Sequence, residues 1–314
     1  REWGPYLSER QWGTVREDYS ADGSYWDYFG FEQARSRAYR WGEDGIGGFS
    51  DERQLFCVSL AFWNHHDPIL KDRLFGLSNS EGNHGEDVKE YYYYLDALPT
   101  HSYLRMLYKY PQSPFPYEEL RAKNKSRAKE PREFELVETG CFDENRYFDI
   151  SIEYGKVSHD DIVLEVTVHN RGPDAAPIDV LPQLWFRNVW SWKPDTTKPV
   201  IYKVDEGHVA ARHIELEEIH FYAEGDGNFI FCENETHPVR IHGFKKAPGY
   251  YKDGFHDYIV DGVGKAINPL QTGTKAAAHY RLMVEAGGTA TVRCRFGHHR
   301  HEDPFGAFGE EMSK

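Results

Sequence analysis

The sequence predicts a mainly β fold: a large antiparallel β-sandwich with long N-terminal loops and a few short helices. From about residue 142 onward, short segments alternate apolar and polar residues, as half-buried antiparallel strands do. Turns rich in Gly, Asn and Asp separate these segments, and no long helical pattern lies between them. Many strands at short spacing without crossover helices favour two packed sheets over a βαβ fold. Hydrophobic residues make up 39% of the 314 residues and aromatic residues 15%, which is enough for a substantial core.

Residues 1–140 are predicted to be the loop-rich part of this sandwich. Within it, residues 51–63 form either a strand pair or a short helix, because the period of their apolar residues is ambiguous. The four consecutive tyrosines at 91–94 predict one amphipathic strand with two rings on each face. Residues 116–133, rich in Glu, Lys, Arg and Ala, predict a solvated helix or connector.

Residues 141–296 are predicted to hold the regular strands of the same domain. The alternating segments are 146–154, 162–168, 178–186, 213–222, 229–232, 278–284 and 290–296. The chain from 297 to 314 opens with a His-rich stretch that breaks any strand, and it ends on the pattern of a helix start. We expect this last segment to be a linker.

The bulk charge restricts the class of partner. A net charge of −14 argues against nucleic acid and anionic membranes, because a phosphate backbone needs clustered Lys and Arg. An acidic, aromatic-rich chain instead suits a neutral ligand such as a carbohydrate. No apolar run approaches the roughly 18 residues of a membrane helix, and no basic-then-apolar signal opens the sequence. Four cysteines lie among apolar neighbours without a CxxC pair, which predicts free core thiols and a cytoplasmic location: Cys57, Cys141, Cys232 and Cys294.

Three stretches, 3–20, 39–45 and 82–87, mix aromatic or imidazole rings with carboxylates, and the first two also carry arginines. Aromatic faces beside ionised carboxylates can stack on a sugar ring and hydrogen-bond its hydroxyls. Each stretch holds two adjacent acids, and neighbouring side chains diverge, so one pair rarely supplies both catalytic groups of a glycosidase. Three roles stay open for these acids: salt bridges to nearby arginines, contact with a sugar, or direct catalysis. Among the tryptophans, Trp12 and Trp41 are the better ligand candidates, whereas Trp185 is expected in the core.

The sequence does not point to a metal or cofactor. The C-terminal histidines offer too few ligands at a recognised spacing, so a solvated linker is expected there instead: His298, His299 and His301. A phosphate loop, a dinucleotide fingerprint and a nucleophilic triad are all absent from the sequence. We therefore expect no cofactor.

The aromatic and acidic stretches resemble the start of bacterial proteins assigned to glycoside hydrolase family 63, which is related to the processing α-glucosidase acting on mannosyl-oligosaccharides. The resemblance covers nearly the whole chain and is carried by residues 3–20, 40–45, 82–90 and 181–188. It implies a large enzyme with an N-terminal β-supersandwich, which here would be residues 1–296, and a following (α/α)6 barrel, toward which residues 297–314 would lead. It also implies an inverting mechanism whose general acid and base both belong to the barrel. No residue of this chain matches that pair, so no catalytic residue is assigned, and the chain alone is expected to be inactive.

What the resemblance implies for this chain is a supporting role. The sandwich would pack on the barrel in cis, and its loops would help to shape the sugar-binding cleft. The residues expected on that side are Trp12, Arg16, Glu17, Trp41, Glu43, Asp44, His84, Glu86 and Asp87. Two alternatives belong to other classes: a free-standing carbohydrate-binding module, and a structural or assembly domain with a separate helical partner. The helix start at residue 310 favours the glycosidase interpretation over both.

Overall fold

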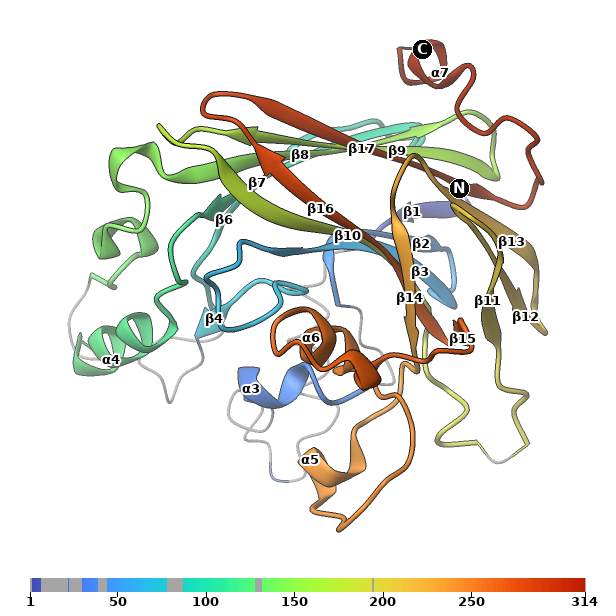
Figure 1. Ribbon diagram of the computed structural model, residues 1–314, viewed down its shortest axis with the longest axis horizontal. Coiled ribbons are helices and arrows are strands. Elements are labelled where there is room, and N and C mark those ends of the chain that lie inside the picture. Colours follow the sequence, from blue (N-terminus) through green and yellow to red (C-terminus); the bar gives the residue numbers. More distant parts are fainter. Residues whose placement is uncertain are drawn as a thin grey trace.

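The computed structural model describes residues 2–6, 22, 30–38, 44–77, 87–127, 132–193 and 195–313. They form two packed antiparallel sheets with short helices around them (Figure 1). The strand order is β1-β2-β3-β10-β16-β14 in the six-stranded sheet and β15-β11-β12-β13-β17-β9-β8-β7-β6 in the nine-stranded sheet. The predicted mainly β sandwich is confirmed.

The elements have the following bounds. The six-stranded sheet consists of β1 (Trp3–Pro5), β2 (Ile46–Asp51), β3 (Phe56–Trp63), β10 (Ala176–Phe186), β16 (Lys275–Val284) and β14 (Asn228–Cys232). The nine-stranded sheet consists of β15 (Thr272–Gly273), β11 (Val200–Asp205), β12 (His208–His213), β13 (Leu216–Ala223), β17 (Thr289–Gly297), β9 (Asp161–Asn170), β8 (Tyr147–Lys156), β7 (Tyr103–Pro111) and β6 (Tyr91–Ala97). A separate pair is formed by β4 (Gly76–Leu77) and β5 (Asp87–Val88). The helices are α3 (Phe31–Ala34), α4 (Tyr117–Arg127), α5 (Pro238–His242), α6 (Gly254–Ile259) and α7 (Phe308–Met312), with 3-10 turns η2 (Leu136–Thr139), η3 (Asp143–Asn145) and η4 (Gly264–Ala266).

The core lies between the two sheets, and the alternation of the strands builds it. Leu164 of β9 lies opposite Cys294 of β17, and both are fully buried in the main hydrophobic cluster. The next residues along, Glu165 and Arg293, form an ion pair on the outer side. Because successive side chains point to opposite faces of a strand, each sheet has an apolar inner face and an outer face of different composition.

Most predicted elements are present, with two informative differences. Residues 51–63 form a turn followed by the single strand β3. Residues 91–94 begin β6, which is an edge strand of the nine-stranded sheet. The predicted strand over 213–222 is confirmed from residue 216 onward as β13, whereas His213 ends β12 and residues 214–215 form the turn between the two strands. Ile214 lies in the turn, with 73% of its surface exposed. Because β-branched residues are typical of strands, the turn resembles a continuing strand in the sequence. Helix α4 confirms the helix expected within 116–133.

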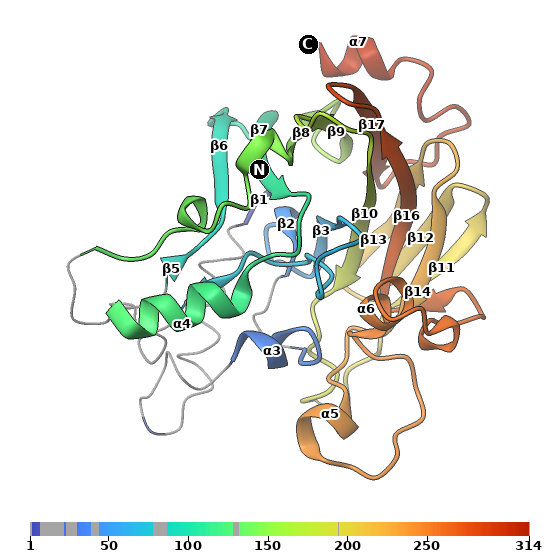
Figure 2. The same ribbon diagram turned by 60° about the vertical axis from the view of Figure 1, so that its left-hand side comes forward.

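The helices cover different faces of the sandwich. Phe255 and Ile259 of α6 pack against Leu181 and Ala277 on the outer face of the six-stranded sheet. Figure 2 shows α4 at the β5 and β6 side of the molecule, away from α6 beside β14. Helix α7 packs against β8 and β9 of the other sheet and buries Phe308. Among the described helices, none combines the length and the apolar character that crossing a membrane requires.

Candidate functional site

Of the nine residues predicted to face the substrate, the structure describes two. Asp87 is described for its backbone, which pairs with Leu77 in the short sheet of β4 and β5. Asp44 is described in full and lies just before β2. The others lie outside the described residues: Trp12, Arg16, Glu17, Trp41, Glu43, His84 and Glu86.

The carboxylate of Asp44 lies between two cations. It forms ion pairs with Arg73 and with Lys252, and the three side chains are 6%, 10% and 2% exposed. The Nζ of Lys252 also donates to the carbonyl oxygens of Ala34 and Arg37, at 3.2 and 2.8 Å. For Asp44, this geometry favours the salt-bridge role over contact with a sugar. The arginine involved comes from a different part of the chain than the neighbours considered in the sequence.

Residues 69–75 contact two of the stretches that carry the resemblance, 40–45 and 82–90. The backbone N–H of Gly45 donates to the carbonyl of Asp72 at 2.5 Å, next to the Asp44–Arg73 pair. The N–H of Lys89 donates to the carbonyl of Phe75 at 2.8 Å, and Lys71 forms an ion pair with Glu90 at 2.7 Å. The sequence did not single out residues 69–75, because their role depends on partners far away along the chain.

Tyr6 of the stretch 3–20 and Trp185 of the stretch 181–188 meet Asp44 on the outer face of the six-stranded sheet. Trp185 of β10 packs with Tyr6 and Cys57 in one buried cluster, as expected for a core tryptophan. The Tyr6 hydroxyl donates to the carbonyl oxygen of Asp44 at 2.7 Å. Gly45, with a φ of +98°, lies so close to β3 that an added Cβ would fall 1.8 Å from the Ser59 hydroxyl oxygen. A left-handed backbone and this close approach both require glycine here.

Two polar side chains on this face are buried with no hydrogen-bond partner among the described residues. Gln183 of β10 and Ser59 of β3 lie opposite each other in the register, and both are 0% exposed. Within the part of the chain that the structure describes, neither the amide of Gln183 nor the hydroxyl of Ser59 has a partner. Native proteins leave few such groups unpaired, because each costs about 1–3 kcal/mol of desolvation. They are unusual within the sandwich and lie where the motif-bearing stretches meet.

Replacing Gln183 by methionine is therefore expected to stabilise the chain by about 1 kcal/mol, since it removes an unpaired amide while keeping the side-chain volume. Urea unfolding would measure the change. The matched control is Gln112→Met, because the Gln112 amide donates to the Asn170 side chain at 2.7 Å and its loss should destabilise. A loss of stability in Gln183→Met as large as in the control would show that the Gln183 amide is paired in solution.

Glu90, the last residue of the stretch 82–90, belongs to a fully buried ionic network. The Lys71 Nζ lies 2.7 Å from Glu90 and 3.7 Å from Asp67, and its side chain is 1% exposed. The hydroxyl of Tyr108 donates to Glu90, and those of Tyr110 and Tyr117 donate to Asp67. Burial, reinforced by the nearby carboxylates, raises the pKa of all three tyrosines well above the ordinary value. The tyrosines therefore act as permanent hydrogen-bond donors to the two carboxylates.

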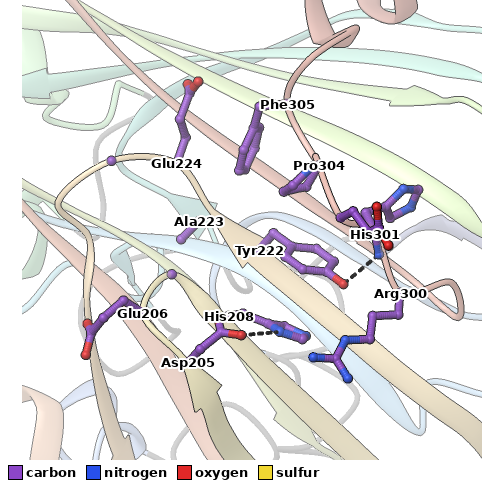
Figure 3. A pocket seen from close by; sticks show the side chains of 13 residues that line it. Asp205, Glu206, His208, Tyr222, Ala223, Glu224, Arg300, His301, Pro304 and Phe305 are labelled. Carbon is purple, nitrogen blue, oxygen red and sulfur yellow. Dashed lines mark hydrogen bonds and ion pairs between the residues drawn. The ribbon is translucent and has the colours of Figure 1, made fainter.

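A second candidate functional site is an open cleft of about 780 Å³, shown in Figure 3. It is bounded by the β11–β12 turn, the β13–β14 turn and the C-terminal segment 300–305. The rings of His208 and Tyr222 stack at its base, with centroids 4.3 Å apart, and both residues are nearly fully buried. The Tyr222 hydroxyl accepts a hydrogen bond from the His301 backbone N–H at 2.9 Å. This bond holds the C-terminal segment against the sheet.

The imidazoles around this cleft are neutral at neutral pH. Burial is the main cause that lowers the pKa of His208, His220 and His301. A hydrogen bond of 3.1 Å joins Nε2 of His208 to Nδ1 of His220. One of these two nitrogens therefore donates and the other accepts. The Asp205 carboxylate lies 3.6 Å from the second nitrogen of His208. These contacts orient the rings without charging them.

The C-terminal histidines are more closely packed than a solvated linker would be. His299 is exposed, but His298 lies 3.2 Å from the Glu218 carbonyl oxygen and His301 is half-buried. Among the described residues, one group of three potential metal ligands meets closely elsewhere: His256, Asp257 and Asp261. Arg240 already binds both oxygens of that Asp257 at 2.9 Å. The contacts present therefore explain this group without an ion.

The cysteines are free, as predicted. Cys57, Cys232 and Cys294 are buried, and Cys141 is half-buried. Burial raises the pKa of the Cys141 thiol to about 11. A thiol with so high a pKa is a poor nucleophile at neutral pH.

Comparison with known proteins gives one clear relative. The chain is 41% identical over 334 residues to an uncharacterized protein of Saccharomyces cerevisiae, YMR196W. The match covers 94% of this chain but 30% of the yeast protein, so the chain spans less than a third of that relative's length. No protein-family model matches the chain.

Among solved structures, the similarity is distant. An Escherichia coli K12 protein assigned as an aldose 1-epimerase is 7% identical with a TM-score of 0.33, over 66% of this chain and 67% of its own. The polysaccharide lyase BACCELL_00875 is 11% identical with a TM-score of 0.33, over 78% of this chain and 26% of its own. Similarity at this level does not extend to activity.

Proposed function

We propose that this chain is the β-sandwich region of a longer glycoside hydrolase of the family 63 type, acting on α-linked glucosides. The observation that supports this most is that the described residues of the four motif-bearing stretches are joined to one another. Tyr6, Asp44 and Trp185 meet on the outer face of the six-stranded sheet, and Glu90 is tied to the same place through residues 69–75. A purely structural sandwich has no need to gather these stretches on one face.

In this proposal, the outer face of the six-stranded sheet is oriented toward the sugar-binding cleft and supports the loops that border it. The general acid and base are supplied by an (α/α)6 barrel in the rest of the polypeptide. The greater length of the yeast relative agrees with such an arrangement. The buried Asp44–Arg73 and Lys71–Glu90 pairs would hold the loop ends in position, which matters because small displacements of positioning groups are costly to catalysis.

The test is an assay of a longer protein that contains this chain. Glucose release from α-linked glucose disaccharides is followed by proton NMR, and an inverting enzyme first releases the β-anomer. Trp41→Ala and Glu86→Gln are expected to lower kcat/KM by about 10- to 100-fold with little change in Tm. Leu270→Ala, at a side chain that is 81% exposed on a different loop, is the control and should retain full activity.

Two results would count against the proposal. Failure to release glucose from every disaccharide would exclude the substrate class. Wild-type kinetics in Trp41→Ala and Glu86→Gln, with hydrolysis intact, would exclude a role for this side of the sandwich in shaping the cleft. A free-standing carbohydrate-binding module is the second candidate, favoured by the open cleft of Figure 3 on the other sheet.

A further inference from the structure

The cleft of Figure 3 lies on the opposite side of the sandwich from the outer face of the six-stranded sheet. Val209 of β12 and Phe221 of β13 are buried in the core between the sheets. Because side chains alternate along a strand, the neighbouring His208, His220 and Tyr222 point to the outer face of the nine-stranded sheet. A ligand in this cleft would therefore not compete with one near Trp185.

The base of the cleft is held in one arrangement before any ligand arrives. The stacked rings of His208 and Tyr222 are nearly parallel, with an angle of 18° between their planes. The hydrogen bond between His208 and His220 and the one from the His301 backbone N–H to Tyr222 fix both rings at their edges. A pre-organised base loses little conformational freedom on binding, which favours affinity. The volume of about 780 Å³ is that of a small-molecule site.

The rim of the cleft combines three kinds of chemistry. Pro304 and Phe305 form an apolar wall on one side, and Asp205 lies across the cleft from them (Figure 3). Arg300 extends beside the ring of His208 in Figure 3 and has no ion-pair or hydrogen-bond partner in the part of the chain that the structure describes. Glu224 completes the rim near the β13–β14 turn. Carboxylates accept hydrogen bonds, guanidinium groups donate them, and an aromatic ring packs against apolar C–H groups.

We propose that this cleft is a binding site for a neutral mono- or oligosaccharide, separate from the proposed catalytic face. Sugar hydroxyls both donate and accept, so they can satisfy carboxylates and a guanidinium at the same time. The C–H face of a pyranose would pack on Phe305. An anionic ligand fits less well, because the carboxylates around the cleft outnumber Arg300, its one guanidinium: Asp205, Glu206, Glu224 and Glu302. This inference does not depend on hydrolysis by the longer protein.

The experiment is calorimetric titration of the complete chain with glucose, maltose and maltotriose, and with glucose 6-phosphate as the anionic comparison. Binding of a neutral sugar is expected. Phe305→Ala and Arg300→Gln should each weaken it by about tenfold, which corresponds to 1.4 kcal/mol. The matched controls are Phe244→Ala and Arg132→Gln, whose side chains are exposed elsewhere and which should bind as the wild type does.

Each outcome of the titration either supports this binding site or overturns it. Binding that is lost in the two cleft variants and retained in the controls, with unchanged Tm throughout, supports the site. Absence of heat from all three neutral sugars at about 10 mM would overturn it, as would tighter binding of glucose 6-phosphate than of glucose. Sugar binding that both cleft variants retain would also overturn it, because the ligand would then occupy another place. Glucose release by the longer protein, measured separately, reports on the proposed function alone.

Discussion

Lys71→Met is expected to lower the free energy of unfolding by about 3–5 kcal/mol, because it leaves buried carboxylates without their cation. The side chains of Lys71, Glu90 and Asp67 are at most 1% exposed, so water cannot replace the ammonium group. Lys71 also lies 3.8 Å from the centroid of the Phe115 ring and donates to the Tyr117 hydroxyl. Urea unfolding monitored by tryptophan fluorescence would measure the loss.

Two further variants establish the cause of that loss. Lys125→Met removes an exposed lysine from α4 and should change stability by less than about 0.5 kcal/mol. The double variant Lys71→Met/Glu90→Gln removes both charges of the closest pair and should recover part of the lost stability. If the single variant lost less than about 1 kcal/mol, the buried charges would not be coupled as the geometry indicates.

Asp44→Asn is expected to destabilise the chain by about 3 kcal/mol, because the guanidinium of Arg73 would keep its charge in a buried place after losing the carboxylate of Asp44. An arginine cannot release its proton at any accessible pH, so neutralisation does not relieve the cost. In a longer, active protein, the same variant should lose activity in proportion to its loss of folded protein. Unfolding curves and kcat at a temperature well below Tm would separate the two effects.

The control for this prediction is Asp257→Asn, which removes a carboxylate from an arginine at a more exposed position. Arg240 is 41% exposed there, so a cost of no more than about 1 kcal/mol is expected. A large loss of kcat in Asp44→Asn with unchanged stability would contradict the structural role of Asp44. That result would instead support the contact between Asp44 and a sugar that was predicted from the sequence.

The strands of the second half could be predicted because alternation is a local property. Segments 162–168 and 290–296 lie within strands of the nine-stranded sheet, 146–154 lies in β8 apart from its first residue, and 178–186 lies in β10. The two strands β11 and β12 were not predicted from the sequence. Both are short and interrupted by charged residues and a turn, so their periods are too brief to recognise.

The candidate site was harder to predict, because it is assembled from distant residues. Asp44 was identified as a chemically interesting acid, but its cationic partners come from residue 73 and residue 252. The cleft of Figure 3 is formed by two strand turns and the C-terminal segment. Of these, only the histidine-rich C-terminal segment was considered from the sequence. No local pattern predicts which of these segments meet.

The sequence by itself therefore determined the fold class, the positions of most strands and the burial of Trp185. Each follows from hydrophobic periodicity, which a strand expresses through its own residues. The tertiary structure alone decided that Asp44 pairs with Arg73, that Gln183 and Ser59 have no hydrogen-bond partner among the described residues, and that His208 stacks on Tyr222. Interactions of charge and hydrogen bonding act over a few ångströms in space, so their partners are set by sheet register and packing and not by distance along the chain.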